Sequence, residues 1–172
     1  MEILIPGLLL VAFMAWASTR IKRNAAAAFD AETIETDEII VNKPERFLHV
    51  LNDTTGNIFR AYSKDFGTVG RQEIRQATIE VRRHRDRSLD DAVEAARSGA
   101  ESFESVTPYL DAGERALTAR SVLIREGAEM EVHHKFVTRG HDVVEARAEL
   151  LFEHKDEYVR SIEEMLETLR VK

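Results

Sequence analysis

The chain has 172 residues, of which 44% are hydrophobic and 32% charged, a balance typical of globular proteins rather than of disordered ones. It contains no cysteine, which excludes disulfides, thiolate zinc sites and cysteine nucleophiles. Its net charge is −7, and beyond residue 23 it holds 21 basic and 30 acidic residues, so nucleic acid is not an expected partner.

The first predicted element is an apolar helix. Residues 3–19 carry no charge, and their number is at the lower limit for crossing about 30 Å of hydrocarbon. Ile21 and the aliphatic stems of the neighbouring basic residues extend the segment predicted to contact a lipid bilayer to residues 3–21. Trp16 is placed where an amphipathic ring favours the headgroup region. We therefore predict that residues 1–29 form an N-terminal transmembrane anchor with a helical extension.

The alternative is a cleaved export signal, since residues 15–17 match an A-x-A cleavage pattern. Such a signal has a basic start, whereas this chain begins with Glu2 and no lysine or arginine. Three basic residues follow the apolar run instead: Arg20, Lys22 and Arg23. By the positive-inside rule they favour a single-pass protein of the inner membrane, with its N-terminus outside and its domain in the cytoplasm. The signal reading would place the domain in the periplasm.

Residues 30–37 are acidic and lack an apolar period, which predicts a linker before a domain at residues 38–172. Three extended segments are predicted first, at 39–51 with a bend at Pro44, at 58–63 and at 76–83. A helix follows, in which Ser88 is expected to cap the first amides with Asp91 three positions later. Its apolar stripe runs to Phe103.

The second half of the domain is predicted to have the same order of elements, three strands followed by a helix. Three strands joined by short glycine turns are predicted at 117–125, 129–136 and 143–152. An amphipathic helix is predicted to close the chain at 158–169. The expected fold is α+β, with an antiparallel sheet of about six strands and two packed helices in the order β-β-β-α-β-β-β-α.

This order of elements resembles the PsbP-like fold of photosystem extrinsic proteins, bacterial DcrB-type proteins and the Mog family of Ran-binding proteins. The resemblance rests on "IIVNKPERFLHVLN", "FRAYSKDF", "ATIEVRRHRDRSLDDAVEAARSGAESF" and the closing "EEMLETLRV", and covers about residues 38–171. A cystatin-like or other α+β sandwich shares much of this pattern. The PsbP-like resemblance implies a non-enzymatic accessory module that binds or stabilises a larger complex, often one in a membrane.

The sequence departs from these relatives in two ways. Photosystem members are exported to a lumen, whereas this N-terminus predicts a cytoplasmic domain. Many bacterial relatives carry an acylated cysteine, which this chain lacks. No site residue of the family can be transferred to this chain.

The histidines are the main candidates for a metal site. His133 and His134 are adjacent on a predicted strand, so they point to opposite faces and cannot chelate one ion. We interpret His134 as a hydrogen-bonded core histidine and place His133 on a solvated face with Glu131 and Lys135. His141 falls in a turn, and no zinc-binding spacing is present.

No catalytic, cofactor-binding or metal-binding residue is therefore predicted. Adjacent carboxylates such as Asp90 and Asp91 diverge on a helix, and no nucleophile elbow, Walker loop or dinucleotide-binding motif occurs. The expected function is a membrane-tethered accessory subunit, or an assembly or stability factor, of an integral membrane protein complex. The alternative is a tethered domain that binds a small ligand or a lipid in a cleft between sheet and helix.

Overall fold

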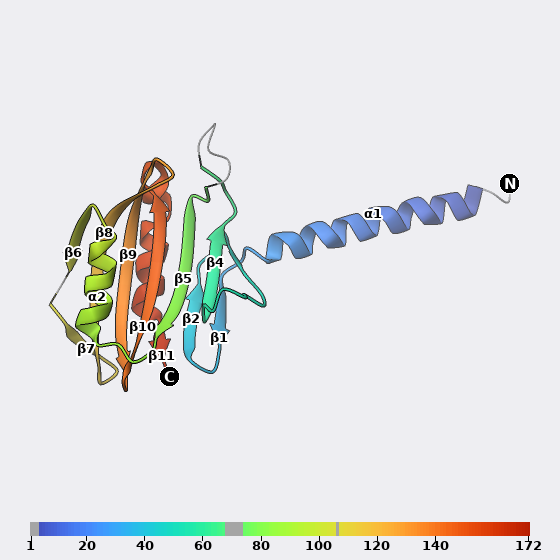
Figure 1. Cartoon of the computed structure of the whole chain (residues 1–172). Coiled ribbons are helices and arrows are strands. Elements are labelled where there is room, and N and C mark those ends of the chain that lie inside the picture. Colours follow the sequence, from blue (N-terminus) through green and yellow to red (C-terminus); the bar gives the residue numbers. More distant parts are fainter. Residues whose placement is uncertain (1–3, 68–73, 106) are drawn as a thin grey trace.

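A computed structural model of the chain describes residues 4–67, 74–105 and 107–172, and Figure 1 shows its elements. The helices are α1 (Leu4–Ala27), α2 (Leu89–Ser98), the 3-10 helix η1 (Phe152–Glu157) and α3 (Val159–Thr168). The strands are β1 (Glu32–Glu35), β2 (Ile39–Lys43), β3 (Phe47–His49), β4 (Phe59–Ser63), β5 (Ala77–His84), β6 (Ser102–Ser105), β7 (Tyr109–Asp111), β8 (Glu114–Arg125), β9 (Ala128–Arg139), β10 (Asp142–Leu151) and β11 (Arg170–Val171).

An eight-stranded antiparallel sheet forms the body of the domain. Its strand order is β3-β4-β5-β10-β9-β8-β6, and β7 also pairs with β8. The long strands β8, β9 and β10 form a meander, as the sequence predicts. Gly127 has a φ of 73° in the turn between β8 and β9, a backbone conformation that glycine adopts without the strain of a Cβ atom.

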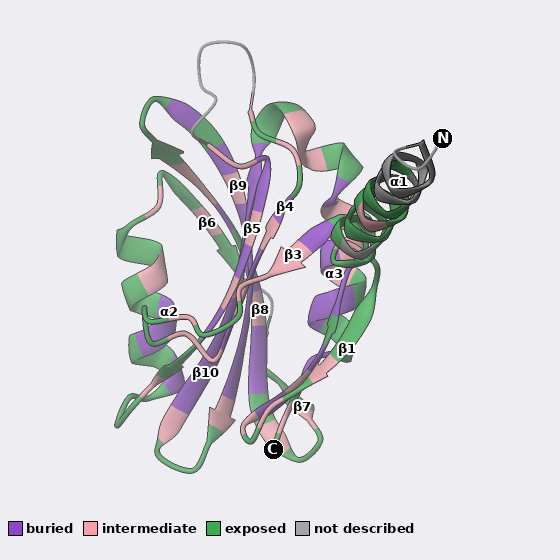
Figure 2. Ribbon diagram, turned by 90° about the vertical axis from the view of Figure 1, so that its right-hand side faces the viewer, coloured by how far each residue is buried: buried purple, intermediate pink, exposed green. Residues whose placement is uncertain are grey.

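Two helices cover opposite faces of this sheet (Figure 2). The apolar stripe of α3 is buried through Ile162, Met165 and Leu166, and it packs on small and branched side chains of β5 and β10. Burial of each such side chain contributes roughly 1.5–3 kcal/mol to folding. A second, three-stranded sheet with the order β1-β2-β11 lies beside α3 and closes this core.

Helix α2 covers part of the other face. Its N-terminus is capped as predicted, since the Ser88 hydroxyl accepts a hydrogen bond from the Asp91 amide at 3.1 Å. Leu89, Ala92 and Val93 are buried against β8, β9 and β10. The rest of this face carries charged side chains and a small apolar cluster around Met130 and Leu151, and no helix of the described residues lies over it.

The α+β class and the antiparallel sheet are confirmed, but the predicted number of strands is wrong. Residues 30–37, predicted to be a linker, contain β1, which pairs with β2 in register from Glu32 with Lys43. The expected helix reaches only Ser98, because residues 102–105 form ladder hydrogen bonds with β8 as β6. β7 and β11 are short strands whose sequences carry no clear alternation.

The N-terminal segment forms the long helix α1, which stands away from the sheets in Figure 1. In the part of the chain that the structure describes, no helix combines the length and apolar character needed to cross a membrane. The predicted transmembrane helix is therefore not supported, and residues 1–3 of the predicted anchor lie outside the described residues.

Lys43 fixes the chain where it enters the domain after α1. Its side chain is buried, and its ammonium group donates hydrogen bonds to the carbonyl oxygens of Phe47 at 2.8 Å, Ala28 at 3.4 Å and Asp30. Burial lowers the pKa of Lys43, although the negative charges of Glu32 and Asp30 oppose this shift. These hydrogen bonds from Lys43 connect the segment after α1 to β2 and β3.

Candidate functional site

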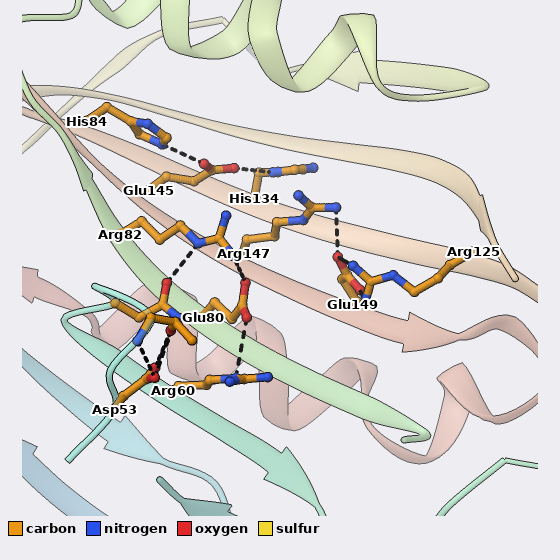
Figure 3. A network of polar contacts seen from close by, with 12 residues as sticks. Asp53, Arg60, Glu80, Arg82, His84, Arg125, His134, Glu145, Arg147 and Glu149 are labelled. Atoms are coloured by element: carbon orange, nitrogen blue, oxygen red, sulfur yellow. Dashed lines mark hydrogen bonds and ion pairs between the residues drawn. The ribbon is translucent and has the colours of Figure 1, made fainter. Parts of the chain in front are cut away.

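The uncovered part of the sheet carries rows of alternating charge, which we call the open face. Arg60 on β4 lies opposite Glu80 on β5, and Glu80 lies opposite Arg147 on β10. Residues that are directly opposite on neighbouring strands point to the same side of a sheet. The three side chains therefore form one row across three strands, and Figure 3 shows their arrangement.

Ion pairs connect this row to its neighbours. The Glu80 carboxylate contacts Arg82 and lies 3.4 Å from Nε of Arg60. The Glu149 carboxylate is almost fully buried, and it lies 2.7 Å from Arg147 and 2.6 Å from Arg125. The arginines are partly exposed, so the ion pairs that they form contribute little to stability.

The arginines of the open face are more exposed than the glutamates with which they pair. Four arginines, Arg60, Arg82, Arg125 and Arg147, pair with Glu80 and Glu149. Glu145 lies opposite Arg82 on the same side of the sheet, and Glu126 lines the same hollow. Such a surface presents planar guanidinium groups suited to carboxylates. Chemically, it can dock a negatively charged partner.

A buried chain of hydrogen bonds borders the open face where α2 begins to cover the sheet. Glu145 of β10 lies between two imidazole rings, with Oε2 2.8 Å from Nε2 of His84 and Oε1 2.9 Å from Nδ1 of His134. The other ring nitrogen of His134 lies 3.0 Å from the Ser121 hydroxyl. Burial alone raises the pKa of the Glu145 carboxyl, but hydrogen bonds with His134 and His84 lower it to about 2.

The order Ser121, His134, Glu145 matches the geometry of a hydrolytic triad. A nucleophile must also reach a substrate carbonyl, and here Ser121 and His134 are 3% and 2% exposed. The His134 ring stacks on Phe136 at 5.6 Å, and Phe103 lies 6.1 Å away. We interpret the chain as a structural link between β5, β8, β9 and β10, and His134 is the hydrogen-bonded core histidine that the sequence predicts.

The prediction for His133, Glu131 and Lys135 is wrong, because these residues face α3 rather than solvent. His133 is 3% exposed and its Nε2 lies 2.8 Å from Glu131, which also accepts from Lys155 at 2.8 Å. Lys135 is equally buried and pairs with Asp111 of β7 at 2.7 Å. Burial lowers the pKa of His133, although Glu131 opposes the shift.

A groove of about 540 Å³ lies between α3 and the β6–β8 edge of the sheet. It is lined by residues of five elements: Glu104, Ser105, Tyr109, Thr118, Ala119, Arg120, His133, His134, Glu163, Leu166 and Glu167. This volume lies within the range of roughly 300–1,000 Å³ that is usual for small-molecule sites. The sequence predicts a cleft between sheet and helix in general terms, but not which residues line it.

The other three histidines lie away from these groups, and His49 of β3 stacks on Phe59. His154 lies 3.1 Å from Glu157 in the turn before α3, and His141 is exposed in the turn between β9 and β10. Among the described residues, no three histidine or carboxylate side chains are grouped in a way that could hold a metal ion.

Comparison with known proteins relates the fold to solved structures. No protein-family model matches the chain, and no curated protein matches its sequence. LpqN of Mycobacterium tuberculosis, described as involved in cell envelope biogenesis, superposes with a TM-score of 0.61 at 10% identity over 83% of this chain and 91% of its own.

Two further structures share the arrangement. The cyanobacterial PsbP protein of Synechocystis matches with a TM-score of 0.54 at 12% identity, covering 85% of this chain and 94% of that one. The Ran-binding protein Mog1p of Saccharomyces cerevisiae matches with a TM-score of 0.52 at 9% identity, covering 83% and 96%. These likenesses confirm the fold that the sequence predicts, and at such identities they show the fold alone.

Proposed function

We propose that this PsbP-like domain is a non-enzymatic accessory module that stabilises or helps to assemble an integral membrane protein complex. The observation that carries the proposal is the exposure of α1. Large apolar side chains lie on this helix without cover from the domain: Val11, Phe13, Met14, Trp16 and Ile21, each more than half exposed. Such a surface requires lipid or a partner protein to cover it.

We propose further that residues 3–21 contact the bilayer. The guanidinium of Arg20 lies over the Trp16 ring, 5.3 Å from its centroid. Tryptophan and arginine in this arrangement are typical of a membrane interface, where the ring is half solvated and the cation reaches the headgroups. With Arg20, Lys22 and Arg23 inside, the domain lies in the cytoplasm; the exported form, with a periplasmic domain, is the competing arrangement.

The open face is the surface that we propose docks on the complex. Its arginines are more exposed than the glutamates with which they pair, so the matching surface is a segment of the membrane protein that presents carboxylates. Charged surfaces of this kind govern the rate and specificity of association more than its affinity.

Affinity purification from detergent-extracted membranes at native expression tests this function. The full chain should recover an integral membrane protein in stoichiometric amount. Arg82→Glu on the open face should reduce recovery severalfold, whereas Arg97→Glu, an exposed control on α2, should not. Recovery of the chain as a monomer without partner would contradict the proposal.

A second function is supported by the groove between α3 and the sheet edge. Its volume of about 540 Å³ would admit a small organic ligand, and its lining includes the buried side chain of Leu166. A domain that binds a small ligand or a lipid next to the membrane is therefore the alternative proposal. Binding of any small apolar probe at the groove, seen by nuclear magnetic resonance, would support it.

A further inference from the structure

Three groove side chains belong to one row across the sheet. Glu104 on β6 lies opposite Arg120 on β8, and Arg120 lies opposite His133 on β9. Because directly opposite residues point to the same side, all three side chains face α3. Arg120 forms an ion pair with Glu163 of α3 across the groove. The row and the helix thus form the two walls.

The charge of the groove is negative. Three carboxylates line it, from Glu104, Glu163 and Glu167, against the single guanidinium of Arg120, which Glu163 already engages. Among the described residues, Glu104 and Glu167 have no ion-pair or hydrogen-bond partner. The negative charge of Glu167 also reaches Tyr109, whose pKa is raised first by burial and then by Asp111 and Glu167.

The wall formed by the sheet offers a polar atom without a partner. His133 is 3% exposed, and within the described part of the chain its only hydrogen bond runs from Nε2 to Glu131. Its Nδ1 is therefore free to bond to a group in the groove, and burial favours the neutral ring. Leu166 of α3 supplies buried apolar surface to the groove. Among the described residues, this ring nitrogen has no protein partner, and His133 lines the groove.

We propose that this groove binds a small molecule that carries a protonated amine on an apolar or aromatic body. The amine lies among the carboxylates of Glu104 and Glu167, and the body lies against Leu166 and the Tyr109 ring. An anion of the same size would meet three carboxylates and one guanidinium that is already paired, so it is disfavoured. This inference rests on the second proposed function, that the domain binds a small ligand.

Three probes with the same ring separate charge from shape: tryptamine as the cation, tryptophol as the neutral form and indole-3-propionate as the anion. Each is titrated into the ¹⁵N-labelled full chain in detergent micelles at low ionic strength. We expect tryptamine to bind at least tenfold more tightly than indole-3-propionate. The largest chemical-shift changes should fall on the amides of Tyr109, His133 and Leu166.

Matched variants assign the effect to the carboxylates. Glu104→Gln and Glu167→Gln should each weaken tryptamine binding by about threefold, as expected for partly exposed ion pairs, and the double variant by about tenfold. Glu153→Gln, an exposed control in η1 away from the groove, should leave the affinity unchanged. Binding of tryptophol should not change in any of these variants.

The outcomes distinguish the preference for an amine from the more general proposal that the groove binds a small ligand. Equal affinity for all three probes at the groove, or no effect of the two glutamine substitutions, would overturn the preference for an amine while leaving ligand binding intact. No binding of any probe, or shift changes confined to residues outside the groove, would overturn both.

Discussion

Glu145 fixes the ring of His134 in the core: its carboxylate oxygen Oε1 lies 2.9 Å from Nδ1, and the same carboxylate holds His84. Replacement by glutamine keeps the size of the side chain but removes the negative charge that accepts both bonds. We expect Glu145→Gln to lower the free energy of unfolding by about 2–3 kcal/mol, measured by urea titration. Glu129→Gln, exposed on β9, is the control, and equal effects of the two would contradict this role.

The low pKa of the Glu145 carboxyl leads us to predict that the domain loses stability at acid pH. Its pKa is about 2 in the folded chain and near 4.5 when unfolded, so its ionised form favours the folded state above pH 4.5. That contribution should be lost progressively as the pH falls from about 4.5 towards 2. Urea titrations across this range should show a steeper decline for the wild type than for Glu145→Gln.

Protonation of His133 is expected to cause a separate loss of stability as the pH falls below neutrality. Burial lowers its pKa below the ordinary value of 6.5, so below that pH the unfolded chain binds a proton more readily than the folded one. His49 is shifted in the same direction by burial. Stability should therefore be greatest above pH 6.5 and decrease as the pH falls from 7 to 5. His133→Gln should flatten this dependence, and an unchanged slope would exclude His133 as its source.

Lys43→Met tests the connection between α1 and the domain. Methionine fits the buried volume but leaves three carbonyl oxygens without their donor. We expect the free energy of unfolding to fall by about 2–3 kcal/mol, and the amides of residues 28–30 to exchange faster. Glu45→Gln, at an exposed position between β2 and β3, should have little effect. Unchanged exchange in Lys43→Met would show that the carbonyl contacts do not hold the segment.

The predicted strands and helices agree with the structure where a long periodic pattern exists. The alternation in β5 and β9 and the apolar stripe of α3 were sufficient to predict these elements. A half-buried strand and an amphipathic helix each require one apolar face. The missed strands β1, β6, β7 and β11 have two to four residues, and pairing with a neighbour rather than local sequence determines them.

The site was less predictable than the fold. His133 and Lys135 alternate with apolar residues and so were assigned to solvent, but α3 covers that face too, and both are buried. The open face did have a signal, since Glu80 and Arg82, and likewise Glu145 and Arg147, are two residues apart and must share a face. Which rows they joined depended on the strand order, and the sequence does not specify this.

The topology of the N-terminal segment can be tested with a reporter fused after Lys172. Transfer of Arg20, Lys22 and Arg23 across a membrane is unfavourable, each costing about 2.5–3.5 kcal/mol at a helix centre on insertion scales. The fusion should be active only with a reporter that works in the cytoplasm. Neutral residues at these positions, with lysines added after Met1, should invert or scramble the orientation. A mature chain that begins at Ser18 would favour the cleaved signal.

Photocrosslinking in living cells tests the central claim most directly. A photoreactive residue replaces either Arg82, which is partly exposed on the open face, or Glu153, which is exposed in η1, in the full chain at native expression. The account predicts that position 82 crosslinks to one integral membrane protein, and that position 153 does not. No crosslinked partner at position 82, or the same mixture of soluble proteins from both positions, would contradict the account of a docking module at the membrane.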